Sequence, residues 1–206
     1  MDLNEKYMRA AMKEAHKAEL KDEVPIGAVI VCDGKIIARA HNTRQTKQIS
    51  THHAEMLCIE KACRKLNSWR LEGCDLYVTL EPCPMCAGAI QQSRIRKVVF
   101  GAYDPKGGFF GSNFNINEVK GLNHYPEVEG GVMKEETAQL LKDFFRKKRP
   151  DFLADNTYST DEGEIEVELE DKNLAFSPEE SVDYSETKRL MAEMLNNLPD
   201  DQRMVI

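Results

Sequence analysis

Apolar residues recur along the chain in two periods, one typical of helices and one typical of strands. Residues 5–20 carry apolar side chains at three- and four-residue spacing, which predicts an amphipathic helix. The apolar run 25–32 has the length of a strand. Asp33-Gly34 follows it as a type I′ turn signal, and 35–40 completes a predicted β-hairpin.

Strands and helices alternate over the rest of the first 150 residues. Further strand patterns cover 74–80, 97–101 and, more weakly, 127–132, and helical patterns cover 54–66, 84–93 and 135–149. The last helix is expected to pack through Ala138, Leu141 and Phe145. An opening hairpin followed by helical crossovers predicts a three-layer α/β domain with a mixed sheet, antiparallel at the hairpin and parallel through the crossovers.

The chain changes character after Pro150. Residues 1–150 carry 24 Lys and Arg against 19 Asp and Glu, whereas residues 151–206 carry 4 against 16. We therefore expect a mildly basic domain over 1–150, suited to a polyanionic partner, and an acidic extension over 151–206. Residues 155–173 have few large apolar groups and predict little stable structure, and a short helix is expected after Ser177.

Overall composition places the chain among soluble globular proteins. It has 206 residues, of which 41% are hydrophobic and 31% charged, and no apolar run has the length of a membrane span. The first residues lack a basic-then-apolar secretory signal, so a cytoplasmic location is expected. The six cysteines would stay reduced there, which favours metal ligation or burial over disulfides.

Two short motifs carry the candidate chemistry. Cys83 and Cys86 have the spacing that lets both sulfurs reach one zinc ion from a turn that opens a helix. With His53 they would supply three ligands and leave the fourth position to water, as in a catalytic zinc site. Glu55 lies two residues beyond His53, where its carboxylate can carry protons between the water and a leaving group. These residues predict hydrolytic deamination of an amino-substituted aromatic ring.

The motifs resemble those of the cytidine and nucleotide deaminase superfamily, whose signature combines His-x-Glu with Pro-Cys-x-x-Cys. Within it, the chain is most similar to bacterial tRNA adenosine deaminases, which convert adenosine at the first anticodon position to inosine. The resemblance covers about residues 4–149 and not the acidic extension. The segments that carry it are 23–29, 40–42, 51–55, 68–71, 76–83, 85–88, 93–95, 98–102, 104–108 and 123–124.

This resemblance implies a cytidine-deaminase-like fold with about five strands in a mixed sheet between helical layers. It implies one Zn²⁺ per subunit on His53, Cys83 and Cys86, with Glu55 as the catalytic proton carrier. The expected assembly is a homodimer. The expected partner is the anticodon stem-loop of tRNA, with no membrane and no DNA.

The resemblance also implies a set of substrate contacts. Asn42 and Asn123 match positions that bind the target nucleoside, and Asp104 matches one that contacts a neighbouring ribose. A carboxylate that accepts from a 2′-hydroxyl would favour RNA over DNA. Lys106 would face phosphates, as would the basic run 146–149. Tyr125 stands where the family pattern has a basic residue, which leaves one backbone contact open.

Other interpretations remain open. Asn42 could simply end the second strand, Asp104 could cap a turn before Pro105, and the run 146–149 could be a solvated helix end. A free nucleobase or nucleotide deaminase, of the guanine or cytosine type, would use the same metal chemistry. A non-catalytic, zinc-stabilised RNA-binding subunit is a third hypothesis, against which Glu55 argues. The acidic extension is interpreted as a solubilising appendage, or alternatively as a competitor of RNA for the basic domain.

Overall fold

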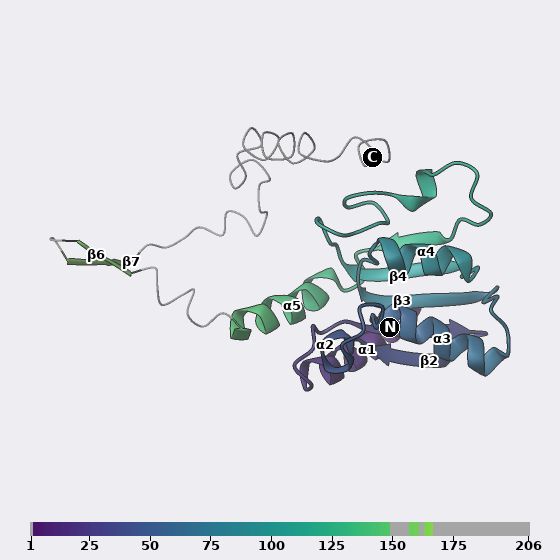
Figure 1. The fold of residues 1–206 in the computed structure, drawn as a ribbon, viewed down its shortest axis with the longest axis horizontal. Helices are drawn as coiled ribbons and strands as arrows, with labels where there is room; N and C mark the ends of the chain where they lie inside the picture. Colours follow the sequence, from purple (N-terminus) through teal and green to yellow (C-terminus); the bar gives the residue numbers. More distant parts are fainter. Residues whose placement is uncertain (1, 149–156, 161–162, 167–206) are drawn as a thin grey trace, which may run out of the picture. The chain divides into compact units, whose positions relative to one another are not determined.

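The computed structural model describes residues 2–148, 157–160 and 163–166 (Figure 1). Residues 2–148 form a sheet with the strand order β2-β1-β3-β4-β5 and helices around it. The strands are β1 (Gly27–Cys32), β2 (Lys35–His41), β3 (Cys74–Leu80), β4 (Lys97–Ala102) and β5 (Glu127–Gly130). The helices are α1 (Leu3–Glu19), α2 (Arg44–Lys47), α3 (Ala54–Leu66), α4 (Pro84–Gln92) and α5 (Lys134–Lys148). Among these described helices, none has the length and apolar character needed to cross a bilayer.

The five-stranded sheet is mixed, as the sequence predicts. Strand β1 is antiparallel to both of its neighbours, β2 and β3, whereas β3, β4 and β5 run parallel. The hairpin turn has positive φ at Asp33 (48°) and Gly34 (71°), which confirms the type I′ turn. Helices connect β2 to β3 and β3 to β4, and a long loop with a 3₁₀ turn (Ile116–Glu118) connects β4 to β5. The predicted α/β architecture is therefore confirmed.

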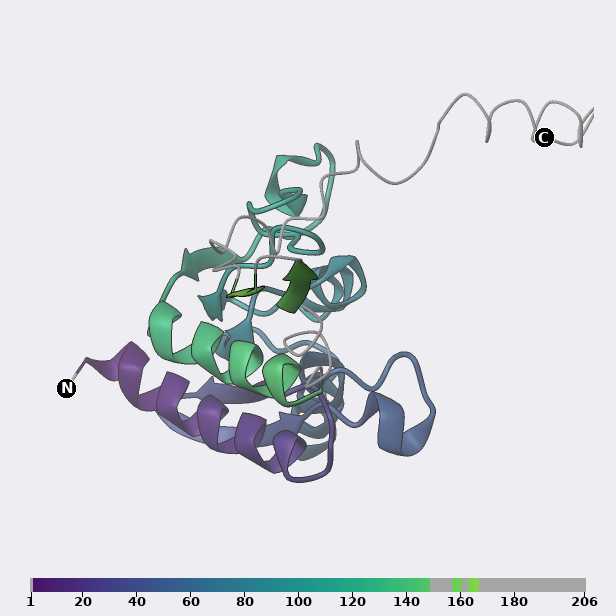
Figure 2. The ribbon, with the colours of Figure 1, turned by 90° about the vertical axis from the view of Figure 1, so that its left-hand side faces the viewer.

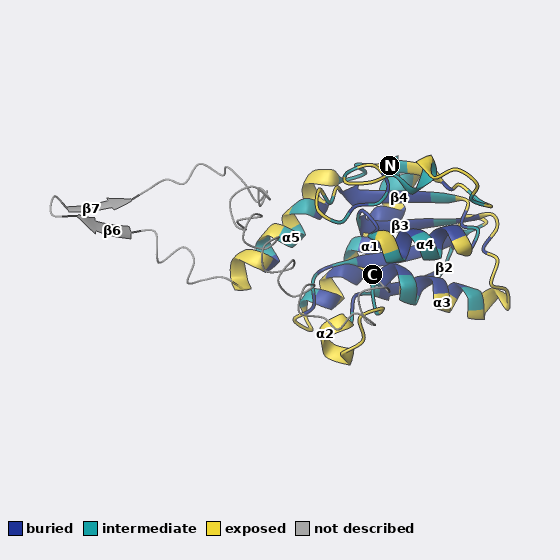
Figure 3. Ribbon diagram, turned by 45° about the horizontal axis from the view of Figure 1, so that its top comes forward, coloured by how far each residue is buried: buried dark blue, intermediate teal, exposed yellow. Residues whose placement is uncertain are grey.

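Two apolar cores lie on opposite faces of the sheet. Alternate residues of β1 supply them: Ala28 and Ile30 belong to the core that includes α3 and α4, and Val29 and Val31 belong to the core that includes α1. This period of two is the strand periodicity that puts successive side chains on opposite faces. The result is the predicted three-layer arrangement (Figure 2), with the central strands buried and α2 exposed (Figure 3).

Helices α3 and α4 begin immediately after two candidate zinc ligands. His53 is the N-cap residue of α3, and Cys83 is the N-cap residue of α4. Pro84 occupies the first position of α4, where a missing N–H breaks no helical hydrogen bond. The predicted bounds of α3 and β3 are confirmed. Helix α2 was not predicted from the sequence, because its four residues lie within a polar stretch that has no helical periodicity.

Helix α5 packs through a face that differs from the predicted one. Its buried residues are Thr137 and Phe144, whereas Phe145 is 46% exposed. Thr137 lies against Gly101 of β4, where a Cβ on the glycine would be 2.5 Å from Thr137 Oγ1. This close approach orients the helix so that Phe144 faces inward. Leu140 and Leu141, four and three residues earlier, lie on the same side of the helix and are half-buried.

The described residues 157–160 and 163–166 belong to a unit separate from the one that contains residues 2–148. Within it the structure describes a two-stranded antiparallel sheet of β6 (Thr157–Thr160) and β7 (Gly163–Glu166). This hairpin lies in the stretch expected to have little stable structure, and the β-branched and aromatic residues of 157–160 account for its strand character. The helix expected after Ser177 lies outside the described residues.

Candidate active site

His53, Cys83 and Cys86 bring one nitrogen and two sulfur atoms together beyond the end of β3. His53 Nδ1 lies 3.6 Å from Cys83 Sγ and 3.6 Å from Cys86 Sγ. All three ligand-type atoms lie within 4.8 Å of one another. Zn–S bonds of about 2.3 Å and Zn–N bonds of about 2.0–2.1 Å place tetrahedral neighbours at about 3.5–3.8 Å from each other. The spacing of the two His–Cys pairs therefore fits a zinc ion.

The electrostatics of the metal-free cluster favour thiolate, the form of cysteine that binds metal, at Cys83. The pKa of Cys86 is raised instead, by its hydrogen bond to Cys83 and by burial, so Cys86 keeps its proton until a metal ion displaces it. A hydrogen bond with the Cys86 thiol, opposed by partial burial and aided by His53, lowers the pKa of Cys83 to about 4. The same contact with Cys83 raises the pKa of His53, so the imidazole and the thiolate stabilise each other's charge. Cys83 thus holds a negative charge at the start of α4, where the helix dipole also favours it.

Glu55 presents a buried, unsatisfied carboxylate oxygen beside this cluster. It lies in the first turn of α3 and is 4% exposed, and its Oε2 has no hydrogen-bond partner among the described residues. Desolvation by burial raises the pKa of Glu55 above its ordinary value, and the nearby Cys83 thiolate acts in the same direction. A buried polar atom without a partner is costly in a finished structure, so this oxygen fits a role that a ligand completes.

Asn42 lies directly after β2, one residue from a link to the ligand-bearing segment. The backbone N–H of Thr43 donates to the carbonyl of His52 at 3.1 Å, and His52 precedes His53. Asn42 is buried, and its Oδ1 has no partner among the described residues. Asn42 therefore follows the end of β2 and also has a buried carbonyl oxygen without a partner among the described residues. A role in ending the strand and a role in binding the nucleoside are compatible.

Glu23 is a buried glutamate that the sequence analysis did not single out. Its carboxylate accepts from the backbone N–H groups of Gln45 (3.1 Å) and Thr46 (2.5 Å), and Asn42 Nδ2 lies 3.4 Å from Oε2. It therefore holds the start of α2 and the side chain of Asn42 in one place. The available signal was an acid two residues before the apolar run 25–32, but the backbone N–H groups that bind it lie about twenty residues further along the chain.

Glu81 has the corresponding role on the other side of the cluster. It is buried at the end of β3, two residues before Cys83, and accepts from the backbone N–H groups of Asp104, Phe110 and Ser112 at 3.0–3.1 Å. The Ser112 hydroxyl donates to it as well. The loop after β4 is therefore wrapped around a carboxylate that adjoins the candidate metal ligands. The sequence signal was a charge inside the motif 81–86.

Asp104 uses one carboxylate oxygen within its own turn. Its Oδ1 accepts from the backbone N–H groups of Lys106 and Gly107, both at 3.1 Å, so Asp104 caps the turn that contains Pro105. The Asp104 backbone is itself held by Glu81. The Lys106 side chain is exposed on the same loop. The structure thus brings Asp104 and Lys106 to the loop next to the cluster, while leaving their contacts with a substrate as predictions.

Asn123 belongs to the long segment between β4 and β5. It is exposed in the segment that leads into β5. The neighbouring His124 anchors this segment through its Nε2, which lies 2.6 Å from the carbonyl of Ile95. Tyr125 also braces it, donating to the Val119 carbonyl at 2.9 Å and accepting from Leu122 N at 3.0 Å. His124 and Tyr125 therefore stabilise the conformation of this segment.

The basic run at the end of α5 is partly engaged by acidic residues. Lys147 Nζ lies 2.8 Å from Glu19 Oε1, and Lys148 pairs with Asp22. Arg146 lies 3.8 Å from Asp143, and position 149 is outside the described residues. These pairs join the last turn of α5 to the end of α1, which favours a structural role for Lys147 and Lys148.

Comparison with known proteins identifies the family of this fold and site. Residues 2–149 match the family described as MafB19-like deaminase. Over 149 residues the chain is 59% identical to a tRNA-specific adenosine deaminase of Bacillus subtilis, covering 72% of this chain and 92% of that protein. The chain belongs to the tRNA-specific adenosine deaminase family.

Solved structures agree with the assignment to this deaminase family. One comes from a study of A-to-I editing by tRNA:A34 deaminases at the wobble position, with a TM-score of 0.64 and 47% identity over 66% of this chain and 98% of that chain. A guanine deaminase from Nitrosomonas europaea has a TM-score of 0.60 and 25% identity over 68% of this chain and 83% of that one. The family likeness predicted from the motifs is confirmed, and the deaminase match ends before the acidic extension.

Proposed function

We propose that this chain deaminates adenosine to inosine at the wobble position of tRNA anticodons. The observation that carries the proposal is the buried, unpartnered Oε2 of Glu55 beside the His53–Cys83–Cys86 cluster. Relatives named tRNA-specific adenosine deaminases, from Bacillus subtilis and from Aquifex aeolicus at 48% identity, support the substrate. The reaction consumes one water and releases one ammonia, which makes the enzyme a hydrolase of a cyclic amidine C–N bond.

His53, Cys83 and Cys86 would hold one Zn²⁺ per subunit, because their spacing and their donor atoms suit it. Bound there, zinc would supply a water of lowered pKa, about 7, as the nucleophile. The residues of the chain position these ligands. The starts of α3 and α4 hold the His53 imidazole and the two cysteine side chains within 4.8 Å of one another, already close to the spacing that zinc requires.

Glu55 moves the protons. Burial raises the pKa of Glu55 above its ordinary value, which suits a carboxyl group that accepts and returns a proton, and it shields that proton from bulk water. In the addition step Glu55 takes a proton from the attacking water and delivers it to the ring nitrogen beside carbon six of the adenine. In the elimination step Glu55 takes the proton of the new hydroxyl on carbon six and delivers it to the exocyclic amine, which departs as ammonia and leaves the inosine carbonyl.

Asn42, Asp104, Asn123 and Lys106 are proposed to position the nucleotide. The buried Oδ1 of Asn42 offers an acceptor to the flipped-out nucleoside, and Asn123 is proposed as a second contact. Asp104 keeps one carboxylate oxygen for a 2′-hydroxyl, which would favour RNA over DNA. Lys106 is proposed to meet a phosphate. We further propose a cytoplasmic homodimer in which residues 1–150 are the catalytic domain and 151–206 an acidic extension.

The test is incubation of the purified, zinc-loaded chain with a transcribed arginine tRNA that has adenosine at the first anticodon position. Mass spectrometry of nuclease fragments should find inosine at that position. Glu55→Gln should retain zinc and tRNA binding and lose inosine formation. Glu60→Gln is the matched control, because Glu60 is an exposed acid on the same helix. Full turnover by Glu55→Gln would refute the proton-carrier assignment.

A free purine deaminase is the second candidate, because the structure is also similar to a guanine deaminase. Ammonia release from guanine or from free nucleotides, with no inosine in tRNA, would favour it. A chain that binds zinc and tRNA but releases ammonia from none of these substrates would instead be a non-catalytic RNA-binding subunit.

A further inference from the structure

A row of basic side chains follows one face of α1. Lys6, Arg9, Lys13 and Lys17 are spaced by three or four residues, so they share that face, and all four are exposed. From Lys6 to Lys17 the helix rises about 16 Å at ~1.5 Å per residue. Arg39 of β2 adds a fifth positive charge from the edge of the sheet.

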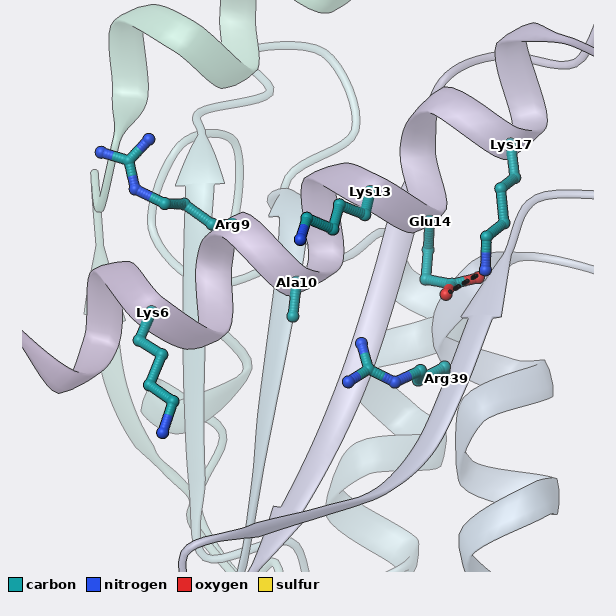
Figure 4. A pocket seen from close by; sticks show the side chains of 7 residues that line it. All are labelled: Lys6, Arg9, Ala10, Lys13, Glu14, Lys17 and Arg39. Atoms are coloured by element: carbon teal, nitrogen blue, oxygen red, sulfur yellow. Dashed lines mark hydrogen bonds and ion pairs between the residues drawn. The ribbon is translucent and has the colours of Figure 1, made fainter.

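These side chains border a hollow between α1 and β2, here called the α1–β2 groove. It has a volume of about 340 Å³ and is lined by Lys6, Arg9, Ala10, Lys13, Glu14, Lys17 and Arg39. Figure 4 shows Arg39 reaching from β2 toward α1, with the short side chain of Ala10 on the facing helix. Five of the seven lining residues are cationic and one is acidic, so the groove has a strong positive charge.

Internal ion pairs neutralise little of this charge. Glu14 is the acid of the groove, and Lys17 already binds it at 2.7 Å. Arg9 reaches Glu5 at 3.9 Å with both side chains about half exposed, a contact of little energetic value. Lys6, Lys13 and Arg39 form no ion pair with any acidic side chain in the part of the chain that the structure describes. Three cations therefore remain available to an anionic ligand.

The groove follows the edge strand β2 from the β1–β2 turn toward the end of the strand that precedes Asn42. At one end Tyr7 OH donates to the carbonyl of Gly34 in the β1–β2 turn, at 2.8 Å. At the other end Glu14 Oε2 lies 3.4 Å from His41 Nδ1, and His41 is followed by Asn42. A strand of nucleic acid that leaves the site beside Asn42 therefore meets this row of cations.

We infer that the α1–β2 groove binds the phosphate backbone of the tRNA substrate outside the anticodon loop. Its length suits several consecutive phosphates, since one strand of a duplex carries one per about 3.4 Å of axis. Lysine and arginine contacts of this kind position the RNA and add affinity without reading sequence. This inference rests on the proposed function, because it takes tRNA to be the substrate.

The test compares full-length, zinc-loaded K13Q/R39Q with the wild type. The dissociation constant for whole tRNA is measured by fluorescence anisotropy across a salt series, together with kcat and KM for inosine formation. Loss of two phosphate contacts should reduce the slope of log Kd against log salt by about 1.4–1.8. Affinity at low salt should fall at least tenfold and KM should rise, with kcat unchanged. Binding of an isolated anticodon loop should be unaffected.

Two further variants control for charge and for fold. Arg64→Gln/Lys65→Gln removes two positive charges from the last turn of α3, at the end of this helix away from the candidate site. The salt slope of this variant should match that of the wild type. Lys13→Arg/Arg39→Lys keeps the charge and should restore the slope. An unchanged slope in K13Q/R39Q would overturn the inference, and tighter tRNA binding would overturn it too, by indicating an acidic competitor for the groove.

Failure of this inference differs from failure of the proposed function. If the wild type makes inosine and K13Q/R39Q has the wild-type salt slope, the groove proposal alone is wrong. If the wild type binds tRNA with a groove-dependent slope but makes no inosine, the groove proposal stands as an RNA contact and the deaminase proposal is wrong.

Discussion

Gly108 lies directly against the carboxylate of Glu81, so closely that a Cβ at Gly108 would overlap the glutamate side chain. The same carboxylate receives the hydrogen bonds that hold Asp104, Phe110 and Ser112. The loop after β4 and the candidate metal ligands therefore share one anchor, because Glu81 lies only two residues before Cys83.

Gly108→Ala is expected to displace this loop from Glu81. Overpacking of this kind costs about 1–3 kcal/mol, and the displaced loop should raise KM for tRNA more than it lowers kcat. Thermal unfolding and steady-state kinetics would measure both effects. Gly88→Ala is the control, because no atom lies within 4 Å of a Cβ there and alanine favours α4. Equal stability and KM in the two variants would contradict the role of Glu81.

Alkylation of the metal-free chain should begin at Cys83. Its pKa of about 4 means that the thiolate persists at every pH above that value, so labelling by iodoacetamide should change little from pH 6 to pH 8. Cys63 is the comparison, because it is also half-buried but desolvation raises its pKa, so its labelling should rise steeply over this range. Peptide mass spectrometry would identify the labelled residues. Added Zn²⁺ should protect Cys83, and labelling that is insensitive to zinc would argue against the proposed ligands.

Gly101→Ala is expected to destabilise the packing of α5 on the sheet. The new methyl group would lie against Thr137, and relieving that overlap should cost about 1–3 kcal/mol. Urea unfolding would measure the loss. The double variant Gly101→Ala/Thr137→Ala tests its cause, because removal of the threonine hydroxyl and methyl should recover part of the stability. A double variant whose losses simply add would mean that the two side chains do not meet.

Deletion of residues 151–206 should preserve catalysis, since the family match ends at residue 149. If the acidic extension competes with RNA for the basic domain, the shortened chain should bind tRNA more tightly at low salt, and the difference should shrink as salt screens the charges. Anisotropy titrations at two salt concentrations would show this. Unchanged affinity would leave the extension as a solubilising appendage.

Local signals in the sequence predicted most elements and the two motifs whose side chains the structure brings together at His53, Cys83 and Cys86. The gap between Cys83 and Cys86, and the placement of His53 before a helical period, depend on residues a few positions apart. The bounds of α3 and β3 follow from equally local features, an abrupt start of helical periodicity and a glycine before an alternating run. Such patterns survive folding because neighbouring residues set them.

Long-range contacts account for what the sequence did not predict. Glu23 and Glu81 matter because loops about twenty and thirty residues further along the chain bring backbone N–H groups to them. The buried face of α5 is rotated by one position because Thr137 meets a glycine on β4. Local periodicity cannot weigh Phe144 against Phe145 without knowledge of that contact.

The two ligand-bearing helices start at fixed positions, while the segment between β4 and β5 is held to the domain by a few side-chain anchors. Residues of this segment that do not bind Glu81 can change in number or chemistry without altering a contact of His53 or Cys83. A common hydrolytic centre can therefore be retained while the residues that surround the substrate are replaced. Replacement of this kind would give tRNA:A34 deaminases and a guanine deaminase one shared fold.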